Sequence, residues 1–99
     1  MAGIIRHVMV TGRVQGVGYR AWSGDQAILL GLQGWVRNRR DGSVEAVFAG
    51  PEDAVLQMIA MCRRGPPPAR VDHVAVSDAM PDMLKLRAGG ETFSQLGTL

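Results

Sequence analysis

Residues 5–14 alternate between apolar and polar side chains, which predicts a half-buried strand. Val8, Val10 and Val14 fall on one side of this pattern. The other side carries His7, Met9, Thr11 and Arg13. The first element of the chain is therefore expected to be a strand with its valines directed into a core.

Two later segments have the period of a helix. In the first, expected over residues 20–32, one face is formed by Tyr19, Ser23, Ala27 and Leu30, and Gly31 is a plausible stop signal. The second is expected to begin at residues 50–53, with Pro51 at its first helical position and acidic residues in its first turn. Its apolar stripe consists of Val55, Met58, Ile59 and Cys62, and the run 65–68 (Gly-Pro-Pro-Pro) ends it.

Three further segments are expected to be strands, over residues 34–39, 43–49 and 70–77. The first two are joined by Asp41-Gly42, a strong signal for a hairpin turn. Residues 80–90 are expected to form a loop, and residues 93–96 a short strand at the edge of the sheet. The order βαββαβ predicts an α+β, ferredoxin-like sandwich: two helices on one face of a mainly antiparallel sheet of four to five strands. Residues 1–99 are expected to be a single domain with its core at about 5–78.

Charge and cysteine content limit the function classes. The net charge of +2, from ten arginines and one lysine against nine acids, is too small to indicate nucleic-acid binding by itself. Cys62 is the only cysteine, and His7 and His73 lack metal-ligand spacing, so neither a disulfide nor a metal site is expected. With no apolar run long enough for a signal peptide or a membrane span, a cytoplasmic protein is expected.

The segment after the first strand is rich in glycine. Gly12, Gly16 and Gly18 allow backbone conformations that a Cβ would forbid, so the loop can direct successive N–H groups at an anion. The helix behind the loop adds positive potential, and Arg20 adds a planar cation suited to bidentate phosphate binding. Such a loop predicts a phosphate cradle over residues 15–20, although tight turns also use glycine for purely structural reasons.

The whole string of residues 12–20, Gly-Arg-Val-Gln-Gly-Val-Gly-Tyr-Arg, resembles the signature of the acylphosphatase family. Residues 34–45, Gly-Trp-Val-Arg-Asn-Arg-Arg-Asp-Gly-Ser-Val-Glu, resemble the second signature of that family, and the resemblance covers most of residues 5–78. It implies the same sandwich fold and hydrolysis of the carboxyl–phosphate bond of acyl phosphates. It also implies that Arg20 and Asn38 are catalytic, and that Asn38 holds the attacking water. From its position alone, Asn38 would be an ordinary residue before a turn.

The implied site comprises Gln15, Gly16, Val17, Gly18, Tyr19 and Arg20 as the phosphate-binding loop, with Asn38 opposite. No cofactor is expected. A general acid is not required either, because a carboxylate whose conjugate acid has a pKa of about 4 leaves without one. Phosphate or sulfate should compete with the substrate. Arg37, Arg39 and Arg40 would raise the local anion concentration if they share a rim with Arg20, although Arg39 could equally face solvent.

Two other functions fit the same layout. RNA-recognition domains share the βαββαβ order, but they need aromatic residues on the sheet, and residues 43–49 hold a single aromatic residue, Phe48. A regulatory domain that senses anions without hydrolysing them is the other alternative. We expect no nucleic acid and no membrane as partners, and a monomer or a weak homodimer. Self-association would use Ile28 and Leu29, which point away from the core face of the first helix.

Overall fold

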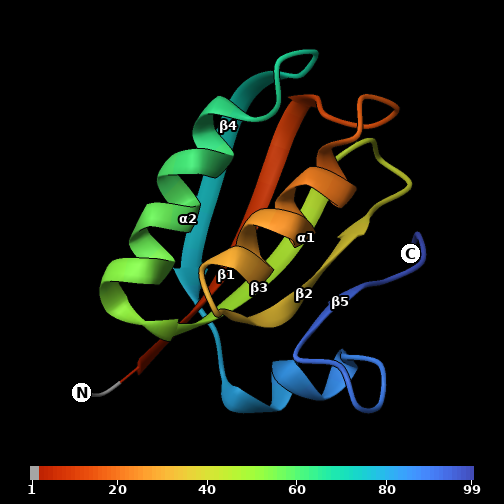
Figure 1. The fold of residues 1–99 in the computed structure, drawn as a ribbon. Coiled ribbons are helices and arrows are strands. Elements are labelled where there is room, and N and C mark those ends of the chain that lie inside the picture. Colours follow the sequence, from red (N-terminus) through yellow and green to blue (C-terminus); the bar gives the residue numbers. More distant parts are fainter. Residues whose placement is uncertain (1–2) are drawn as a thin grey trace.

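Five strands form one sheet in the order β4-β1-β3-β2-β5, and two helices, α1 and α2, cover one of its faces (Figure 1). The computed structural model describes residues 3–99. Along the chain the elements are β1 (Gly3–Arg13), α1 (Tyr19–Leu29), β2 (Gln33–Asn38), β3 (Val44–Pro51), α2 (Glu52–Arg64), β4 (Arg70–Asp78), a 3₁₀ helix η1 (Pro81–Leu86) and β5 (Phe93–Gln95). The expected βαββαβ sandwich is confirmed, and so is the short edge strand after it.

The central strand pairs place the two halves of the fold side by side. β1 is antiparallel to both β3 and β4, and β2 is antiparallel to β3, with Asn38 opposite Val44. β5 runs parallel to β2, which makes the sheet mixed at this edge. As a result, the end of β1 and the end of β2 lie at the same end of the sheet.

The core lies between the sheet and the two helices. The side of β1 that carries Val8 and Val10 is buried there, as the alternation predicted, together with Val44, Ala46 and Phe48 of β3. The stripe of α2 is also buried: Val55, Met58, Ile59 and Cys62. Burying these apolar surfaces supplies the main driving force for the fold.

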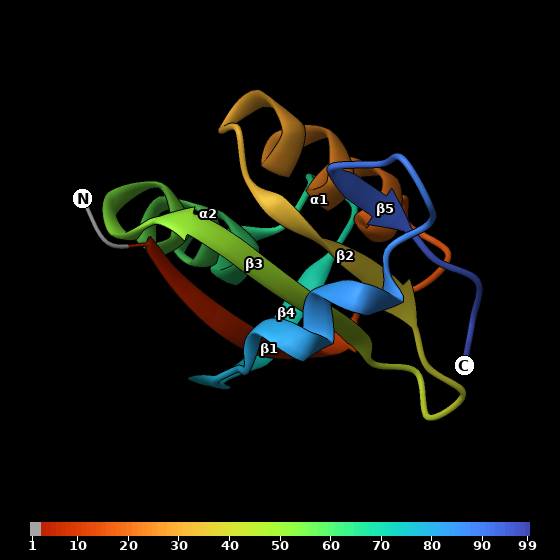
Figure 2. The same cartoon turned by 90° about the horizontal axis from the view of Figure 1, so that it is seen from below.

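The other face of the sheet is partly covered by η1, within a segment that the sequence pattern predicted to be a loop. Figure 2 shows this short helix on the side of the sheet away from α1 and α2. Trp35 is completely buried beneath it, and its indole Nε1 donates to the carbonyl oxygen of Met83 at 2.8 Å. A 3₁₀ helix of six residues is too short to show an apolar period, so the sequence pattern could not reveal it.

The helix boundaries differ from the predicted ones at two points. α1 ends at Leu29 rather than at residue 32, and Gly31, with φ of 72°, turns the chain so that Leu32 enters the core. Pro51 ends β3 and precedes the first helical residue, Glu52, instead of occupying the first helical position. In both cases the chain must turn back sharply onto the sheet.

Two large aliphatic side chains on α1 are exposed, as predicted. Ile28 is 59% exposed and Leu29 is 79% exposed. Self-association through them stays a prediction.

Within residues 3–99, none of the helices has the length and apolar character needed to cross a membrane.

Candidate active site

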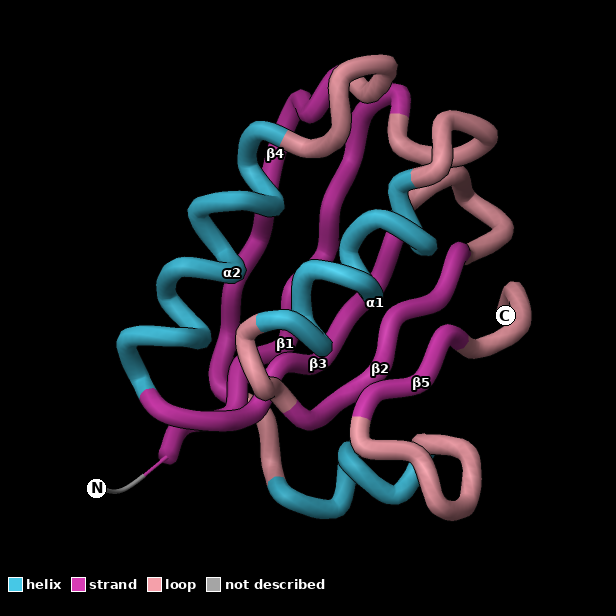
Figure 3. The backbone as a smooth tube through the Cα atoms, in the orientation of Figure 1, coloured by secondary structure: helices cyan, strands magenta, loops and turns pink. Residues whose placement is uncertain are grey.

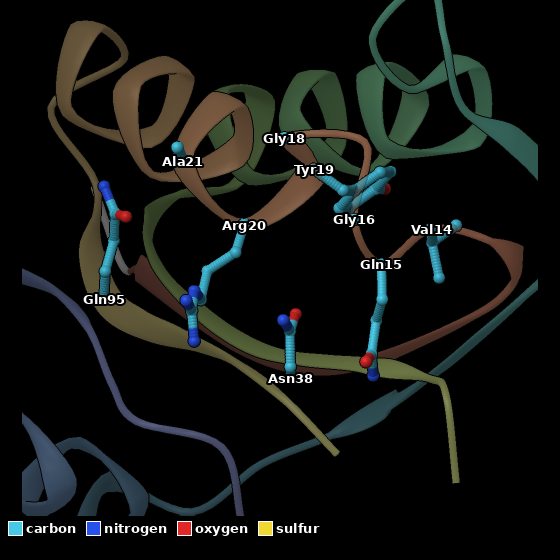
Figure 4. A pocket seen from close by; sticks show the side chains of 9 residues that line it. All are labelled: Val14, Gln15, Gly16, Gly18, Tyr19, Arg20, Ala21, Asn38 and Gln95. Carbon is cyan, nitrogen blue, oxygen red and sulfur yellow. The ribbon is translucent and has the colours of Figure 1, made fainter. Parts of the chain in front are cut away.

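The β1–α1 loop and the β2–β3 hairpin turn lie at the same end of the sheet (Figure 3). Between them is a cavity of about 330 Å³. Its lining comes from the loop, the first turn of α1, the end of β2 and the end of β5: Val14, Gln15, Gly16, Gly18, Tyr19, Arg20, Ala21, Asn38 and Gln95 (Figure 4). The cavity therefore joins the two segments that the sequence singled out.

The N-terminus of α1 opens into this cavity without a side-chain cap. Gly18 is the N-cap residue, in the left-handed conformation with φ of 80°, and the first turn of α1 contains no acidic residue. The Trp22 amide donates to the Gly18 carbonyl oxygen at 2.9 Å. The amides before Trp22 belong to the orphan donors of a helix start, so this end of the helix can bind an anion.

Arg20, in the first turn of α1, extends its guanidinium along the cavity (Figure 4). Nη1 donates to the carbonyl oxygen of Leu96, just after β5, at 3.2 Å. A cation at a helix N-terminus is unfavourable for the helix dipole, and an anion placed between them would remove that conflict.

Asn38, the last residue of β2, faces Arg20 across the cavity (Figure 4). Its side-chain oxygen Oδ1 is buried and is the one buried side-chain polar atom in residues 3–99 that has no hydrogen-bond partner. Its backbone carbonyl is held separately, by the amide of Leu99 at 3.1 Å. A buried acceptor without a donor is costly, so a donor such as a water molecule is needed at this place.

Gln15 ties the loop to the hairpin. Its side-chain nitrogen Nε2 donates to the carbonyl oxygens of Arg39 at 2.6 Å and Ser43 at 2.7 Å. These carbonyls stand at the two ends of the turn that follows Asn38. Both amide hydrogens of Gln15 are used in this way, so its side chain fixes the spacing between the loop and Asn38.

Tyr19 anchors the loop from the opposite side. It is 1% exposed, and its hydroxyl donates to the carbonyl oxygen of Cys62 in the last turn of α2 at 2.7 Å. Burial is the main factor that raises the pKa of the Tyr19 phenol far above its ordinary value, so the hydroxyl keeps its proton. Burial likewise raises the pKa of the Cys62 thiol to about 11, which leaves it unreactive within the core.

Val17 is the exception among the predicted loop residues. Its side chain packs against the core, and it is not part of the lining. The structure brings the other predicted residues together around one cavity: Gln15, Gly16, Gly18, Tyr19, Arg20 and Asn38. The contribution that remains open to Val17 is its backbone N–H.

The expectation that Arg37 and Arg39 could share a rim with Arg20 is wrong. Both side chains lie on the far face of the sheet, where they donate to Oε1 of the buried Glu45 at 2.7 Å and 2.9 Å. His7 Nε2 lies 2.7 Å from the other carboxylate oxygen. The reason is strand alternation: Val36 and Asn38 point toward the helices, so residues 37 and 39 point away.

The Glu45 carboxylate titrates abnormally in this cluster. Burial raises its pKa, but the hydrogen bonds from His7, Arg37 and Arg39 together outweigh burial and hold the pKa below the ordinary value. Arg37 also lies over the Trp35 ring, 4.7 Å from its centre. The two arginines share the single Glu45 carboxylate, and the cluster contributes no charged side chain to the cavity.

Three lining residues were missed by the sequence interpretation: Val14, Ala21 and Gln95. Val14 and Ala21 adjoin the predicted loop, so proximity alone could have indicated them. Gln95 carries no local signal, because only the parallel pairing of β5 with β2 brings it to the site. Within residues 3–99, no group of three or more His, Cys, Asp or Glu residues is arranged to hold a metal ion.

The sequence and the fold both have known relatives. The acylphosphatase family model matches residues 6–87. An acylphosphatase of Rhodopseudomonas palustris is 63% identical over 99 residues, all of both chains. The solved acylphosphatase of Bacillus subtilis superposes with a TM-score of 0.80 at 33% identity, covering 94% of this chain and 98% of that one. The acylphosphatase of Coxiella burnetii gives a TM-score of 0.82 at 31% identity, covering 95% and 93%. The family match, the full-length identity and the fold together show that this chain belongs to the acylphosphatase family.

Proposed function

We propose that the cavity around Arg20 and Asn38 hydrolyses the carboxyl–phosphate bond of acyl phosphates to a carboxylate and inorganic phosphate. Membership of the acylphosphatase family supplies the reaction class. The observation that carries the assignment to this cavity is the unpaired buried oxygen of Asn38, a residue that shares the cavity with Arg20 and an uncapped helix N-terminus. The site thus offers cationic and N–H donors at one side and a lone acceptor at the other.

The phosphoryl group binds to the loop and to Arg20 in this proposal. The backbone N–H groups of residues 15–20 surround its oxygens, and the Arg20 guanidinium holds two of them. These groups are fixed before the substrate arrives, so they can stabilise the charge of the transition state without reorganising. Inorganic phosphate and sulfate, which present the same oxygens, compete for the site.

Asn38 positions the attacking water. Its Oδ1 accepts a hydrogen bond from the water, which orients an oxygen lone pair toward phosphorus. The new bond forms between the water oxygen and phosphorus, and the bond between phosphorus and the acyl oxygen breaks. The electron pair leaves on the carboxylate, and the proton of the water passes to an oxygen of the phosphoryl group.

No general acid is required, because the carboxylate is a weak base, with a conjugate acid of pKa about 4. Catalysis then consists of positioning the water and stabilising the phosphoryl oxygens. This is consistent with a lining that contains neither a carboxylate nor a nucleophilic Ser or Cys side chain. Oligomeric state and a cytoplasmic location stay predictions of the sequence.

An isotope experiment tests the proposal. Benzoyl phosphate is hydrolysed in ¹⁸O-labelled water, and the label is located by mass spectrometry. Attack on phosphorus places the label in inorganic phosphate and none in benzoate, at a rate well above the uncatalysed one. Phosphate should inhibit competitively. Binding of phosphate without hydrolysis would instead support an anion-sensing domain.

A further inference from the structure

Gln95 closes the end of the cavity that lies beyond Arg20. In Figure 4 the Arg20 guanidinium stands between Gln95 on one side and Asn38 on the other. The same guanidinium donates to the carbonyl oxygen of Leu96, the neighbour of Gln95, at 3.2 Å. The cavity therefore runs from Gln15 and Asn38, past Arg20, to Gln95.

A glycine in α1 leaves the space that the Gln95 side chain occupies. Gly24 is buried in the middle of the helix, and a Cβ there would lie 2.9 Å from Nε2 of Gln95 and 3.0 Å from its Cγ. Gly24 is not among the glycines with positive φ, so its backbone does not require glycine. Glycine inside a helix is unfavourable relative to alanine, and the gain here is the space that the Gln95 side chain occupies.

The direction of the leaving group follows from the proposed function, on which this inference rests. In phosphoryl transfer the attacking and leaving oxygens are roughly in line. If Asn38 holds the water, the leaving acyl oxygen points away from Asn38. The acyl group then lies at the end of the cavity formed by Ala21 and Gln95.

We propose that Gln95, seated on Gly24, is a specificity-determining residue that hydrogen-bonds the acyl group of the substrate. Its carboxamide offers both a donor and an acceptor. The preferred substrates are therefore acyl phosphates with a hydroxyl or a similar polar substituent close to the carbonyl carbon. Gln95 is exposed at the mouth of the cavity, so water satisfies its carboxamide when the hydroxyl is missing, and the preference amounts to one neutral hydrogen bond.

The test compares butanoyl phosphate with its 2-hydroxy and 3-hydroxy derivatives. The quantity measured is the ratio of kcat/KM for each hydroxylated substrate to kcat/KM for butanoyl phosphate. The wild-type ratio should exceed one for at least one derivative, and Gln95→Leu should lower it about fivefold, the effect of one neutral hydrogen bond. Gln57→Leu removes the same carboxamide from α2, outside the lining, and should leave the ratio unchanged.

A second variant tests the packing of Gln95 against Gly24. Gly24→Ala should displace the Gln95 carboxamide and lower the ratio in the same direction. The double variant Gly24→Ala/Gln95→Leu should lower it no further than Gln95→Leu alone, because both changes remove one interaction. A purely structural role for this pair would change stability while leaving the ratio constant.

The outcomes separate this inference from the proposed function. A wild-type ratio of one or less for both derivatives, or a ratio that Gln95→Leu leaves unchanged, overturns the inference while hydrolysis of butanoyl phosphate upholds the function. Absence of hydrolysis with all three substrates overturns both.

Discussion

Arg20 and Leu96 are joined by a 3.2 Å hydrogen bond from Nη1 of the guanidinium to the backbone carbonyl oxygen. The two residues are far apart in the sequence, and the bond places the segment after β5 directly behind the cation of the site. One donor of the guanidinium is used by the protein, while the remaining donors stay available to a phosphoryl group. The orientation of Arg20 therefore depends on the last residues of the chain as well as on α1.

Arg20→Lys should lower kcat/KM for benzoyl phosphate by about 10- to 100-fold, the value of one or two charge-assisted hydrogen bonds. An ammonium group is a point charge, so it cannot hold two phosphoryl oxygens in a plane and bond Leu96 as well. Arg20→Ala should abolish measurable hydrolysis and phosphate inhibition. Steady-state kinetics and urea unfolding of each variant provide the check, and wild-type kcat and KM in Arg20→Lys would refute the bidentate role.

Asn38→Ala should lower kcat by about 100- to 1,000-fold, as the loss of a group that acts on the reacting centre does. The inhibition constant for inorganic phosphate should change little, because the loop and Arg20 remain. The backbone bond from Leu99 to Asn38 does not involve the side chain, so the strand end should stay in place. A variant that loses phosphate binding but keeps kcat would reassign Asn38 to the phosphate cradle.

Gln15→Leu should lower kcat about tenfold with a smaller change in the phosphate inhibition constant. The substitution removes the two bonds to the Arg39 and Ser43 carbonyls that set the distance between the loop and Asn38. A misplaced reacting group affects kcat more than binding. Gln15→Glu should lower kcat further, because a carboxylate would face two carbonyl oxygens. Loss of stability with unchanged kcat in the folded variant would limit Gln15 to a structural role.

Much of the fold could be read from local patterns. The valine alternation in β1, the apolar stripe of α2 and the Asp41-Gly42 turn each depend on near neighbours in the sequence. The positions of Arg20 and Asn38 in one cavity also follow from the order of elements, because β1 and β2 end at the same end of the sheet. The hydrogen bonds by which Gln15 joins the loop to the hairpin could not be predicted from the sequence, because they depend on the conformation of the Gln15 side chain.

The sequence interpretation missed two kinds of feature: contacts between residues far apart in the chain, and a short helix without an apolar period. Trp35 belongs to the far face of the sheet, and it is covered by the short 3₁₀ helix η1, which contains Met83 and follows β4. Gln95 and Leu96 arrive at the site through a parallel strand pairing at the edge of the sheet. Arg39 could have been placed correctly, because Asn38 and Arg39 are adjacent in an extended segment and must point to opposite faces.

Acid should weaken the fold through Glu45. Its pKa is lower in the folded protein than its ordinary value of 4.5, so its contribution to stability is complete above about pH 4.5 and is lost as the pH falls through the folded pKa. Glu45→Gln should lower the free energy of unfolding at pH 7 by about 1–3 kcal/mol, because charged donors lose their acceptor. Below pH 4.5 the free energy of unfolding of the variant should fall less steeply with pH than that of the wild type. Urea unfolding from pH 7 to pH 3 measures both, and parallel curves would refute the assignment.

Tyr19→Phe should lower the free energy of unfolding by about 1–2 kcal/mol, since it leaves the Cys62 carbonyl without a donor. The backbone cannot replace that donor: the residue four positions on is Pro66, which has no N–H, and α2 has already ended at Arg64. Because Tyr19 also lines the cavity, kcat/KM should fall as the loop loses its attachment to α2. Thr11→Val removes an exposed hydroxyl from β1 and should change stability by less than about 0.5 kcal/mol. If Tyr19→Phe lost stability but kept wild-type kinetics, the hydroxyl would serve only to end α2; if neither changed, the Cys62 carbonyl would need no donor from the loop.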